Sequence, residues 1–324
     1  MNNNYQLKEK VLHTNNKYFK YVSEGQGPLL LLVHGWPETL YSWRKNIKAI
    51  CGLGYKVVGF NCRGYSDSFT PKKVTDYAIK QYINDILDIM NYFEAAKVIL
   101  VGHDWGAPIC WNMAALYPEK VKAVVGMSVP YFGRGKISSV QLWKELYKNT
   151  FFYQNYFQEV GIAEKELEKD IKESITKIYY WISAEGFKNN IKTSNNKNSG
   201  LLDGLTYPTK PMNWLSNTDI EYLCNEFKKS GFRGPLNRYR NQHKDWIDLP
   251  ELSNLKISSP SLFIGGEYDP VRYFIKNYDS YKNPGKLCSN FFGAHIVKDC
   301  GHWVQQEKPE QVNGIIKNFL EKIS

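Results

Sequence analysis

Short apolar runs alternate with segments of helical periodicity over the first 130 residues of the chain. Four runs predict buried strands: LLLLV (29–33), YKVVGF (55–60), KVILVG (97–102) and VKAVVGMSV (121–129). Apolar residues recur every three to four positions in DYAIKQYINDILDIMNYF and in DWGAPICWNMAALYP, which predicts two helices. Strands that alternate with helices, and that are apolar throughout, favour a parallel sheet covered on both faces.

The pattern changes from about residue 131 to residue 246. This segment is rich in Lys, Asn and Tyr, and most of it has helical periodicity. Strand-like runs then return at SPSLFIGG (259–266) and NFFGAHIVKD (290–299), and a last helix is predicted at PEQVNGIIKNFLEK. We therefore predict an α/β core made of residues 1–130 and 247–324, interrupted by a helical cap (lid) of residues 131–246.

Composition narrows the class of protein only moderately. The 324 residues are 43% hydrophobic and 15% aromatic, enough for a sizeable core, and no run is long and apolar enough to span a bilayer. The start, MNNNYQLKEK, has no apolar segment of the kind found in signal peptides, so we expect a cytoplasmic protein. The formal net charge of +10 comes from Lys and Arg mixed with acidic residues, which predicts a solvated surface and no nucleic-acid partner.

The six cysteines are scattered and form no CxxC pair. We expect free or buried thiols and no disulfide framework. Cys300 lies near His302, but further ligands at suitable spacing are missing, so no metal site is predicted. The cysteines are Cys51, Cys62, Cys110, Cys224, Cys288 and Cys300.

The segment GHDWG (102–106) is the strongest chemical signal in the chain. It has the form G-x-nucleophile-x-G between a predicted strand and a predicted helix, which is the pattern of a nucleophile elbow. Glycines flank the turn because side chains there would collide. The central Asp104 then stands at a helix N-terminus, where the helix dipole favours an anion.

An aspartate at this position indicates the kind of bond that is attacked. A carboxylate that attacks a carbonyl gives a reactive anhydride, whereas attack on saturated carbon gives an alkyl ester that water can hydrolyse. We therefore expect a substrate with a leaving group on saturated carbon, such as an epoxide or a halide.

Hydrolysis of that ester needs a base and an acid that orients it. His302 lies late in the chain, just before the last helix, and is the predicted base. Asp269 follows an apolar strand and precedes a proline, so it is the predicted orienting carboxylate, with Glu267 as a less favoured alternative. The loop after residues 121–129 contains no carboxylate that could take this role.

The segment HGWP (34–37) predicts the other half of an anion-binding site. The backbone N–H groups of Trp36 and Trp105 are the expected donors to the oxyanion that forms when water attacks the ester. We also predict a cis peptide bond before Pro37. For His34 a structural hydrogen bond is favoured over a role as a second base.

These segments resemble the soluble epoxide hydrolases of the α/β-hydrolase superfamily. The likeness covers nearly the whole chain and rests on HGWPETLYSWR, CRGYSDS, VGHDWGAPICW and DCGHWVQQEKPEQVN. It implies an α/β-hydrolase fold, with a mostly parallel central sheet flanked by helices and an inserted helical lid. The elbow and the HGxP segment are shared with haloalkane dehalogenases, so they do not select the substrate.

Two segments of the lid do select it. FFYQNYFQEVGIAEKELE and GFRGPLNRYRN resemble the segments that carry the lid tyrosines of epoxide hydrolases, which by position are Tyr153 and Tyr239. Two phenols could share the charge that develops on the oxygen of an opening epoxide. Tyr156 is an alternative to Tyr153. Arg238 stands where many relatives have an aromatic residue, so the shape and polarity of that pocket wall stay open.

The sequence thus predicts an epoxide hydrolase that forms a vicinal diol from a small-molecule epoxide and needs no cofactor or metal. Asp104 is the predicted nucleophile, and His302 with Asp269 activates water. A haloalkane or haloacid dehalogenase with the same three residues is one alternative, and a non-catalytic ligand receptor on this fold is another. The natural epoxide, the regiochemistry and the oligomeric state are not indicated.

Overall fold

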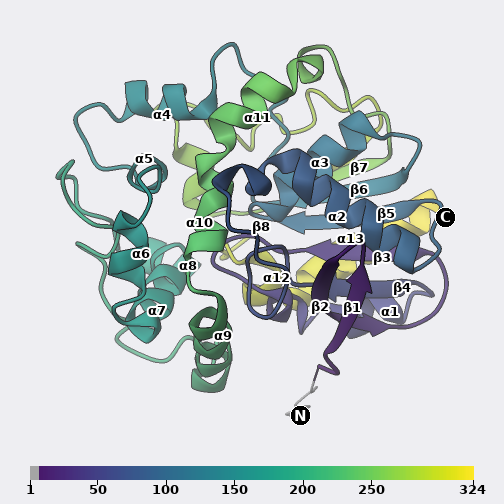
Figure 1. Ribbon diagram of the computed structural model, residues 1–324, viewed down its shortest axis with the longest axis horizontal. Coiled ribbons are helices and arrows are strands. Elements are labelled where there is room, and N and C mark those ends of the chain that lie inside the picture. Colours follow the sequence, from purple (N-terminus) through teal and green to yellow (C-terminus); the bar gives the residue numbers. More distant parts are fainter. Residues whose placement is uncertain (1–6) are drawn as a thin grey trace.

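A single eight-stranded sheet forms the centre of the molecule in the computed structural model, which describes residues 7–324 (Figure 1). Its strands follow the order β1-β2-β4-β3-β5-β6-β7-β8. Pairing is parallel from β4 through β8, whereas β1 and β2 pair antiparallel with each other and β2 with β4. The strands are β1 (Lys10–Thr14), β2 (Lys17–Glu24), β3 (Leu29–Val33), β4 (Lys56–Phe60), β5 (Val98–His103), β6 (Val121–Met127), β7 (Ser261–Gly266) and β8 (Phe291–Val297). The predicted α/β class and the mostly parallel sheet are confirmed.

The predicted apolar runs form the buried middle of the sheet. All residues of β3, β5 and β7 are buried, as expected for strands that are covered on both faces. Successive side chains point to opposite faces, so one run supplies two cores. Leu31 and Leu100 belong to the core on one face, and Leu30 and Ile99 to the core on the other.

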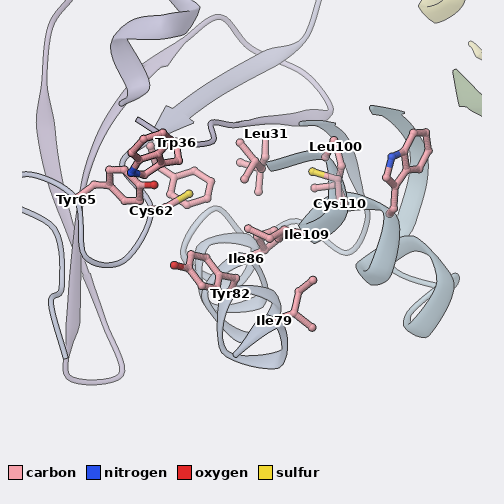
Figure 2. Close-up of a cluster of buried hydrophobic side chains, with 14 of the residues drawn as sticks. Leu31, Trp36, Cys62, Tyr65, Ile79, Tyr82, Ile86, Leu100, Ile109 and Cys110 are labelled. Carbon is pink, nitrogen blue, oxygen red and sulfur yellow. The ribbon is translucent and has the colours of Figure 1, made fainter. Parts of the chain in front are cut away.

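Helices cover both faces of the sheet. On one face α2 packs on α3, which contacts β5 and β6. Figure 2 shows part of the core there: Leu31 and Leu100 from the sheet, Ile79, Tyr82 and Ile86 of α2, and Ile109 and Cys110 of α3. On the other face α1 contacts β4 and α13 contacts β8. The short helix α12 packs against α13 and β7. The helices of the core are α1 (Ile47–Cys51), α2 (Ile79–Tyr92), α3 (Gly106–Leu116), α12 (Val304–Glu307) and α13 (Pro309–Ile323).

A run of helices is inserted between β6 and β7. It lies beside the sheet in Figure 1, in teal and green. The inserted helices are α4 (Ser139–Leu146), α5 (Tyr153–Tyr156), α6 (Ile162–Leu167), α7 (Ile171–Trp181), α8 (Ala184–Lys188), α9 (Asn217–Ser230), α10 (Arg233–Arg240) and α11 (Gln242–Asp248). The expected boundary at residues 246 and 247 falls inside α11. Short 3-10 helices span Leu40–Trp43, Val74–Tyr77, Pro250–Ser253 and Pro270–Tyr273.

No helix within residues 7–324 combines the length and the apolar character needed to cross a bilayer. The polar start of the chain, on which the absence of a signal peptide was predicted, lies partly outside the described residues.

Candidate active site

The turn from β5 to α3 holds Asp104 in a strained position. Its φ of +50° lies in the left-handed region, which residues other than glycine seldom adopt. A Cβ on Gly102 would collide with the backbone of Gly106, and a Cβ on Gly106 would collide with Val33. The two glycines therefore permit the tight turn of the predicted elbow. Asp104 is 9% exposed and borders a cavity.

The loop after β3 binds one oxygen of Asp104. The Trp36 N–H donates to Asp104 Oδ1 at 2.7 Å, and Gly35 lies directly against the same carboxylate. The peptide bond between Trp36 and Pro37 is cis, as predicted. Trp105, the other predicted donor, caps the N-terminus of α3, and its ring packs edge-on against Tyr239 with 5.1 Å between ring centroids.

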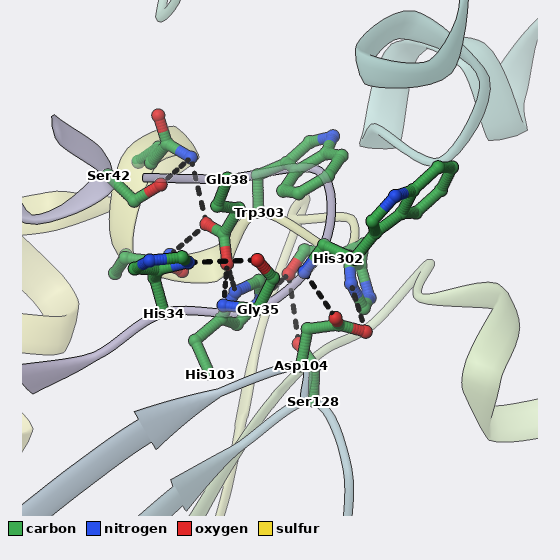
Figure 3. Close-up of polar contacts among 12 residues, drawn as sticks. His34, Gly35, Glu38, Ser42, His103, Asp104, Ser128, His302 and Trp303 are labelled. Carbon is green, nitrogen blue, oxygen red and sulfur yellow. Dashed lines mark hydrogen bonds and ion pairs between the residues drawn. The ribbon is translucent and has the colours of Figure 1, made fainter. Parts of the chain in front are cut away.

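His302 connects the two predicted carboxylates. Its Nε2 lies 3.5 Å from Asp104 Oδ2, and its Nδ1 lies 3.0 Å from Asp269 Oδ2. The alternative acid, Glu267, instead accepts the backbone N–H of Asp299. The structure thus brings Asp104, His302 and Asp269 together in the chain order nucleophile, acid, base (Figure 3 shows Asp104 and His302).

The charges around His302 keep it protonated in the resting protein. Burial alone lowers the pKa of His302, but the carboxylates of Asp269 and Asp104 outweigh burial and hold that pKa well above its usual value. Burial alone would raise the pKa of Asp269. The charge and hydrogen bond of His302 and the hydroxyl of Tyr281 outweigh that effect and lower it.

A buried pair that the sequence analysis did not identify lies next to Asp104 in the chain and contacts the loop that carries His302. His103 Nδ1 lies 2.6 Å from Glu38 Oε2, and His103 Nε2 lies 2.8 Å from the carbonyl oxygen of His302. Glu38 also accepts the Gly35 N–H at 2.9 Å and the side-chain amide of Gln305 at 2.9 Å. Each ring nitrogen of His103 thus lies at hydrogen-bond distance from an oxygen atom. The pair joins the loop after β3, the end of β5 and the loop around His302 (Figure 3).

Glu307 is a second residue that the motifs did not reveal. Its half-buried carboxylate accepts the backbone N–H groups of Gly301 and Trp303, on either side of His302, and that of Ala184 in α8. Burial raises the pKa of Glu307 to about 7. Glu307 therefore positions the loop around His302 and connects it to α8.

His34 has the structural role that was favoured for it. It accepts the Cys62 N–H through Nε2 at 3.0 Å, and its Nδ1 lies 2.9 Å from the Gly35 carbonyl oxygen. Burial lowers its pKa to about 4, so the ring is neutral.

Tyr153 and Tyr239 reach the cavity beside Asp104 from the inserted helices. Both line the same cavity as Asp104, and their ring centroids are 6.0 Å apart. Burial raises the pKa of each phenol, and the nearby charge of Asp104 raises it further, so both carry a proton. The alternative, Tyr156, hydrogen-bonds to Glu166 at 2.9 Å and does not line the cavity.

Arg238 makes the cavity wall beside Tyr239 polar. Its guanidinium donates to the Tyr77 carbonyl, pairs with Asp245 and lies 4.9 Å from the centroid of the Trp105 ring. Burial lowers its pKa to about 10, which leaves it charged at neutral pH. An aromatic residue at this position could make neither polar contact.

The cavity has a volume of about 400 Å³ and lies between the elbow and the inserted helices. Aromatic side chains form much of its wall, including Trp111, Tyr131, Trp143 and Phe274. Its polar groups include Asp104 and the two tyrosines. Ser139 of α4, Gln154 of α5 and Gln242 of α11 are further polar side chains in its wall. The site therefore suits a mostly apolar small molecule with a polar reacting centre.

Comparison with known proteins gives one consistent answer. Residues 28–309 match the family model described as the alpha/beta hydrolase fold. Epoxide hydrolase B of Mycobacterium tuberculosis is 33% identical over an alignment that covers 91% of this chain and 92% of that protein. The chain belongs to the epoxide hydrolases of the α/β-hydrolase family.

Solved structures of this family match in fold as well. The crystal structure of epoxide hydrolase A from Mycobacterium thermoresistibile aligns with a TM-score of 0.91 at 32% identity and covers 98% of both chains. An epoxide hydrolase from an endophytic Streptomyces aligns with a TM-score of 0.90 at 33% identity, over 97% of this chain and 95% of that one. These alignments include the inserted helices, so the likeness extends beyond the core.

Proposed function

We propose that this protein converts an epoxide and water into a vicinal diol through an alkyl ester on Asp104. The observation that carries the proposal is the composition of one cavity, with a carboxylate on one side and two protonated phenols, Tyr153 and Tyr239, on the other. Opening an epoxide needs both a nucleophile and a donor for the departing oxygen.

The first step forms the ester. Asp104 Oδ1 is held by the Trp36 N–H, so Oδ2 is the oxygen proposed to attack a ring carbon. As the new C–O bond forms, the ring C–O bond breaks, and its oxygen takes a proton from one of the two tyrosines. Oδ1 becomes the carbonyl oxygen of the ester, already placed at the Trp36 donor.

The second step hydrolyses the ester. His302, oriented by Asp269, removes a proton from water, and the hydroxide adds to the ester carbonyl carbon. The N–H groups of Trp36 and Trp105 are the proposed donors to the resulting oxyanion. His302 returns its proton to the departing diol oxygen. The second proton of water, released as Asp104 becomes a carboxylate again, replaces the one that the tyrosine gave.

The organisation of the chain and the setting of the reaction are part of the same proposal. Residues 131–246 form a helical cap over a core of residues 1–130 and 247–324, and a small epoxide binds between them. The free state of all six cysteines supports a reducing compartment, and thus the cytoplasm.

Two variants test the chemistry. Asp104→Ala is expected to abolish diol formation from styrene oxide, because no ester can form. His302→Gln is expected to form the ester and stop there, so the intact protein gains the mass of one substrate molecule.

Two results would overturn the proposal. One is diol formation by Asp104→Ala at the wild-type rate. The other is inertness of the wild-type protein toward small, aromatic and fatty-acid-derived epoxides together with halide release from haloalkanes, which would indicate a dehalogenase.

A further inference from the structure

A row of hydrogen bonds from three inserted helices ends at the hydroxyl of Tyr153. Ser139 Oγ of α4 donates to Gln242 Oε1 of α11 at 2.7 Å. Gln242 Nε2 donates to Gln154 Oε1 of α5 at 2.9 Å, and Gln154 Nε2 donates to Tyr153 Oη at 3.0 Å. All four side chains line the cavity that contains Asp104. We refer to Ser139, Gln242 and Gln154 as the amide relay.

The relay has a direction that determines what Tyr153 can do. Each amide oxygen accepts from the preceding group and each NH₂ donates to the next one. A phenol has one proton to donate and an oxygen that can also accept. Because Gln154 uses the acceptor side of Tyr153, the phenolic proton stays free for another acceptor. The opposite direction would make Tyr153 donate to Gln154.

The same contact acts on the charge of Tyr153. Burial and the nearby Asp104 raise the pKa of this phenol, whereas the Gln154 hydrogen bond lowers it. A phenol that gives up its proton gains charge on its oxygen, and a donor at that oxygen stabilises the charge.

We propose that Gln154 is a positioning residue for Tyr153, which directs the phenolic proton toward the epoxide oxygen and stabilises the tyrosine as it gives that proton away. Ser139 and Gln242 fix the orientation of the Gln154 amide. The inference rests on the proposed function and adds a device that acts in the ester-forming step only. Ester hydrolysis uses Asp104 and His302, and neither of them hydrogen-bonds to Ser139, Gln242 or Gln154 in the described residues.

Single-turnover kinetics separate the two steps. With enzyme in excess over styrene oxide, rapid quenching and intact mass give the rates of ester formation and ester hydrolysis. Gln154→Leu is expected to slow ester formation about tenfold, the effect of one hydrogen bond to a group that gains charge, and to leave ester hydrolysis within about twofold. Ser139→Ala is expected to cause a smaller loss in the same step. Gln311→Leu, the same change on an exposed position of α13, is the matched control.

Two further variants test the direction and the route of the effect. Gln154→Glu replaces the donor with an acceptor that takes the Tyr153 proton, so it is expected to slow ester formation more than Gln154→Leu does. In a Tyr153→Phe background, Gln154→Leu is expected to cause no further loss, because the group that it acts through is gone. Thermal unfolding of each variant reports its folding.

Distinct results would overturn the inference. One is a Gln154→Leu protein that folds like the wild type and forms the ester at the wild-type rate. Another is a Gln154→Glu protein that forms the ester as fast as the wild type. Equal losses in both steps that persist in Tyr153→Phe would indicate a structural role. Each of these leaves the proposed function intact, whereas diol formation by Asp104→Ala would overturn the proposed function itself.

Discussion

At the scale of single residues, the charge that surrounds His302 changes during the proposed reaction. In the resting protein the charges of Asp269 and Asp104 outweigh burial and hold its pKa well above the usual value. Formation of the ester removes the charge of Asp104, while burial and Asp269 stay the same. The pKa of His302 is therefore lower in the ester than in the resting protein, which makes the imidazole available as a base after the nucleophile has reacted.

The rate of ester hydrolysis should therefore depend on pH. Only neutral His302 can accept a proton from water, so the rate should rise with pH through the lowered pKa of His302 and then become constant. The ester should accumulate at acidic pH. Intact-mass measurement of the ester after quenching at a series of pH values checks this.

The variant Asp269→Asn tests whether the Asp269 carboxylate raises the pKa of His302. Without the second carboxylate, the rise should move to lower pH, and the maximal rate should fall because the imidazole loses the acceptor that orients it. A hydrolysis rate that does not change with pH, or a rise that moves to higher pH in Asp269→Asn, would contradict this role of His302.

At the scale of elements, the sequence predicted the middle of the sheet better than its edge. The continuous apolar runs became β3 to β7 with ends displaced by one or two residues, because strands covered on both faces have a strong signal. The hairpin of β1 and β2 was missed. β1 has one buried residue, and the buried part of β2 includes Lys20 and Tyr21, so neither strand is a continuous apolar run. Asn15 and Asn16, with φ of +43° and +61°, form its turn and were the available signal.

The candidate site shows a similar division. Motifs with fixed local geometry predicted the positions of Asp104 and His302. His103 and its partner Glu38 are 65 residues apart in the chain. No local sequence pattern connects them, because their contact depends on how the loop after β3 meets the end of β5. Arg238 was noted as unusual, but its carbonyl and carboxylate partners could be assigned only from the fold.

The His103–Glu38 pair leads to a stability prediction for this junction of loops. Burial opposes the charge of Glu38, but His103, the Ser42 hydroxyl and the Gly35 N–H lower its pKa to about 2 from 4.5. Its stabilising contribution is therefore complete above pH 4.5 and is lost as the pH falls toward 2. Glu38→Gln removes the buried carboxylate that contacts His103, the Gly35 N–H and the Gln305 amide, so we expect a loss of about 3 kcal/mol in the free energy of unfolding at pH 7.

Urea unfolding at pH 7 and at pH 3 measures this effect. The difference between Glu38→Gln and the wild type should shrink at the lower pH. Glu251→Gln, at a position whose side chain is 44% exposed, should unfold like the wild type. A Glu38→Gln protein as stable as the wild type at pH 7 would show that the pair is dispensable.

At the scale of the whole molecule, the contacts that α9 makes with the core differ from those that the inserted helices make near the cavity. Near the cavity, Arg238 joins α10 to the Tyr77 carbonyl and to the Trp105 ring. At α9 the contacts are ionic, where Lys20 of β2 pairs with Glu226 at 2.9 Å and Arg44 pairs with Asp219 at 2.9 Å. Of these residues, only Trp105 and Arg238 line the cavity. The geometry therefore separates attachment of the inserted helices at α9 from the chemistry.

The Lys20–Glu226 pair tests this separation. Both side chains are buried, so removal of one charge leaves the other with a weaker partner, Lys229 for Glu226 and Asp67 for Lys20. Lys20→Met and Glu226→Gln should each lower the free energy of unfolding by about 2–3 kcal/mol. The double variant should lose less than the sum of the two, because no unpaired charge is left by the second change. Urea unfolding measures these free energies, and styrene oxide turnover should stay within about twofold of the wild type in all three variants. Additive losses would mean that the two charges do not stabilise each other, and a fall in turnover without a fall in stability would mean that α9 contributes to the geometry of the site.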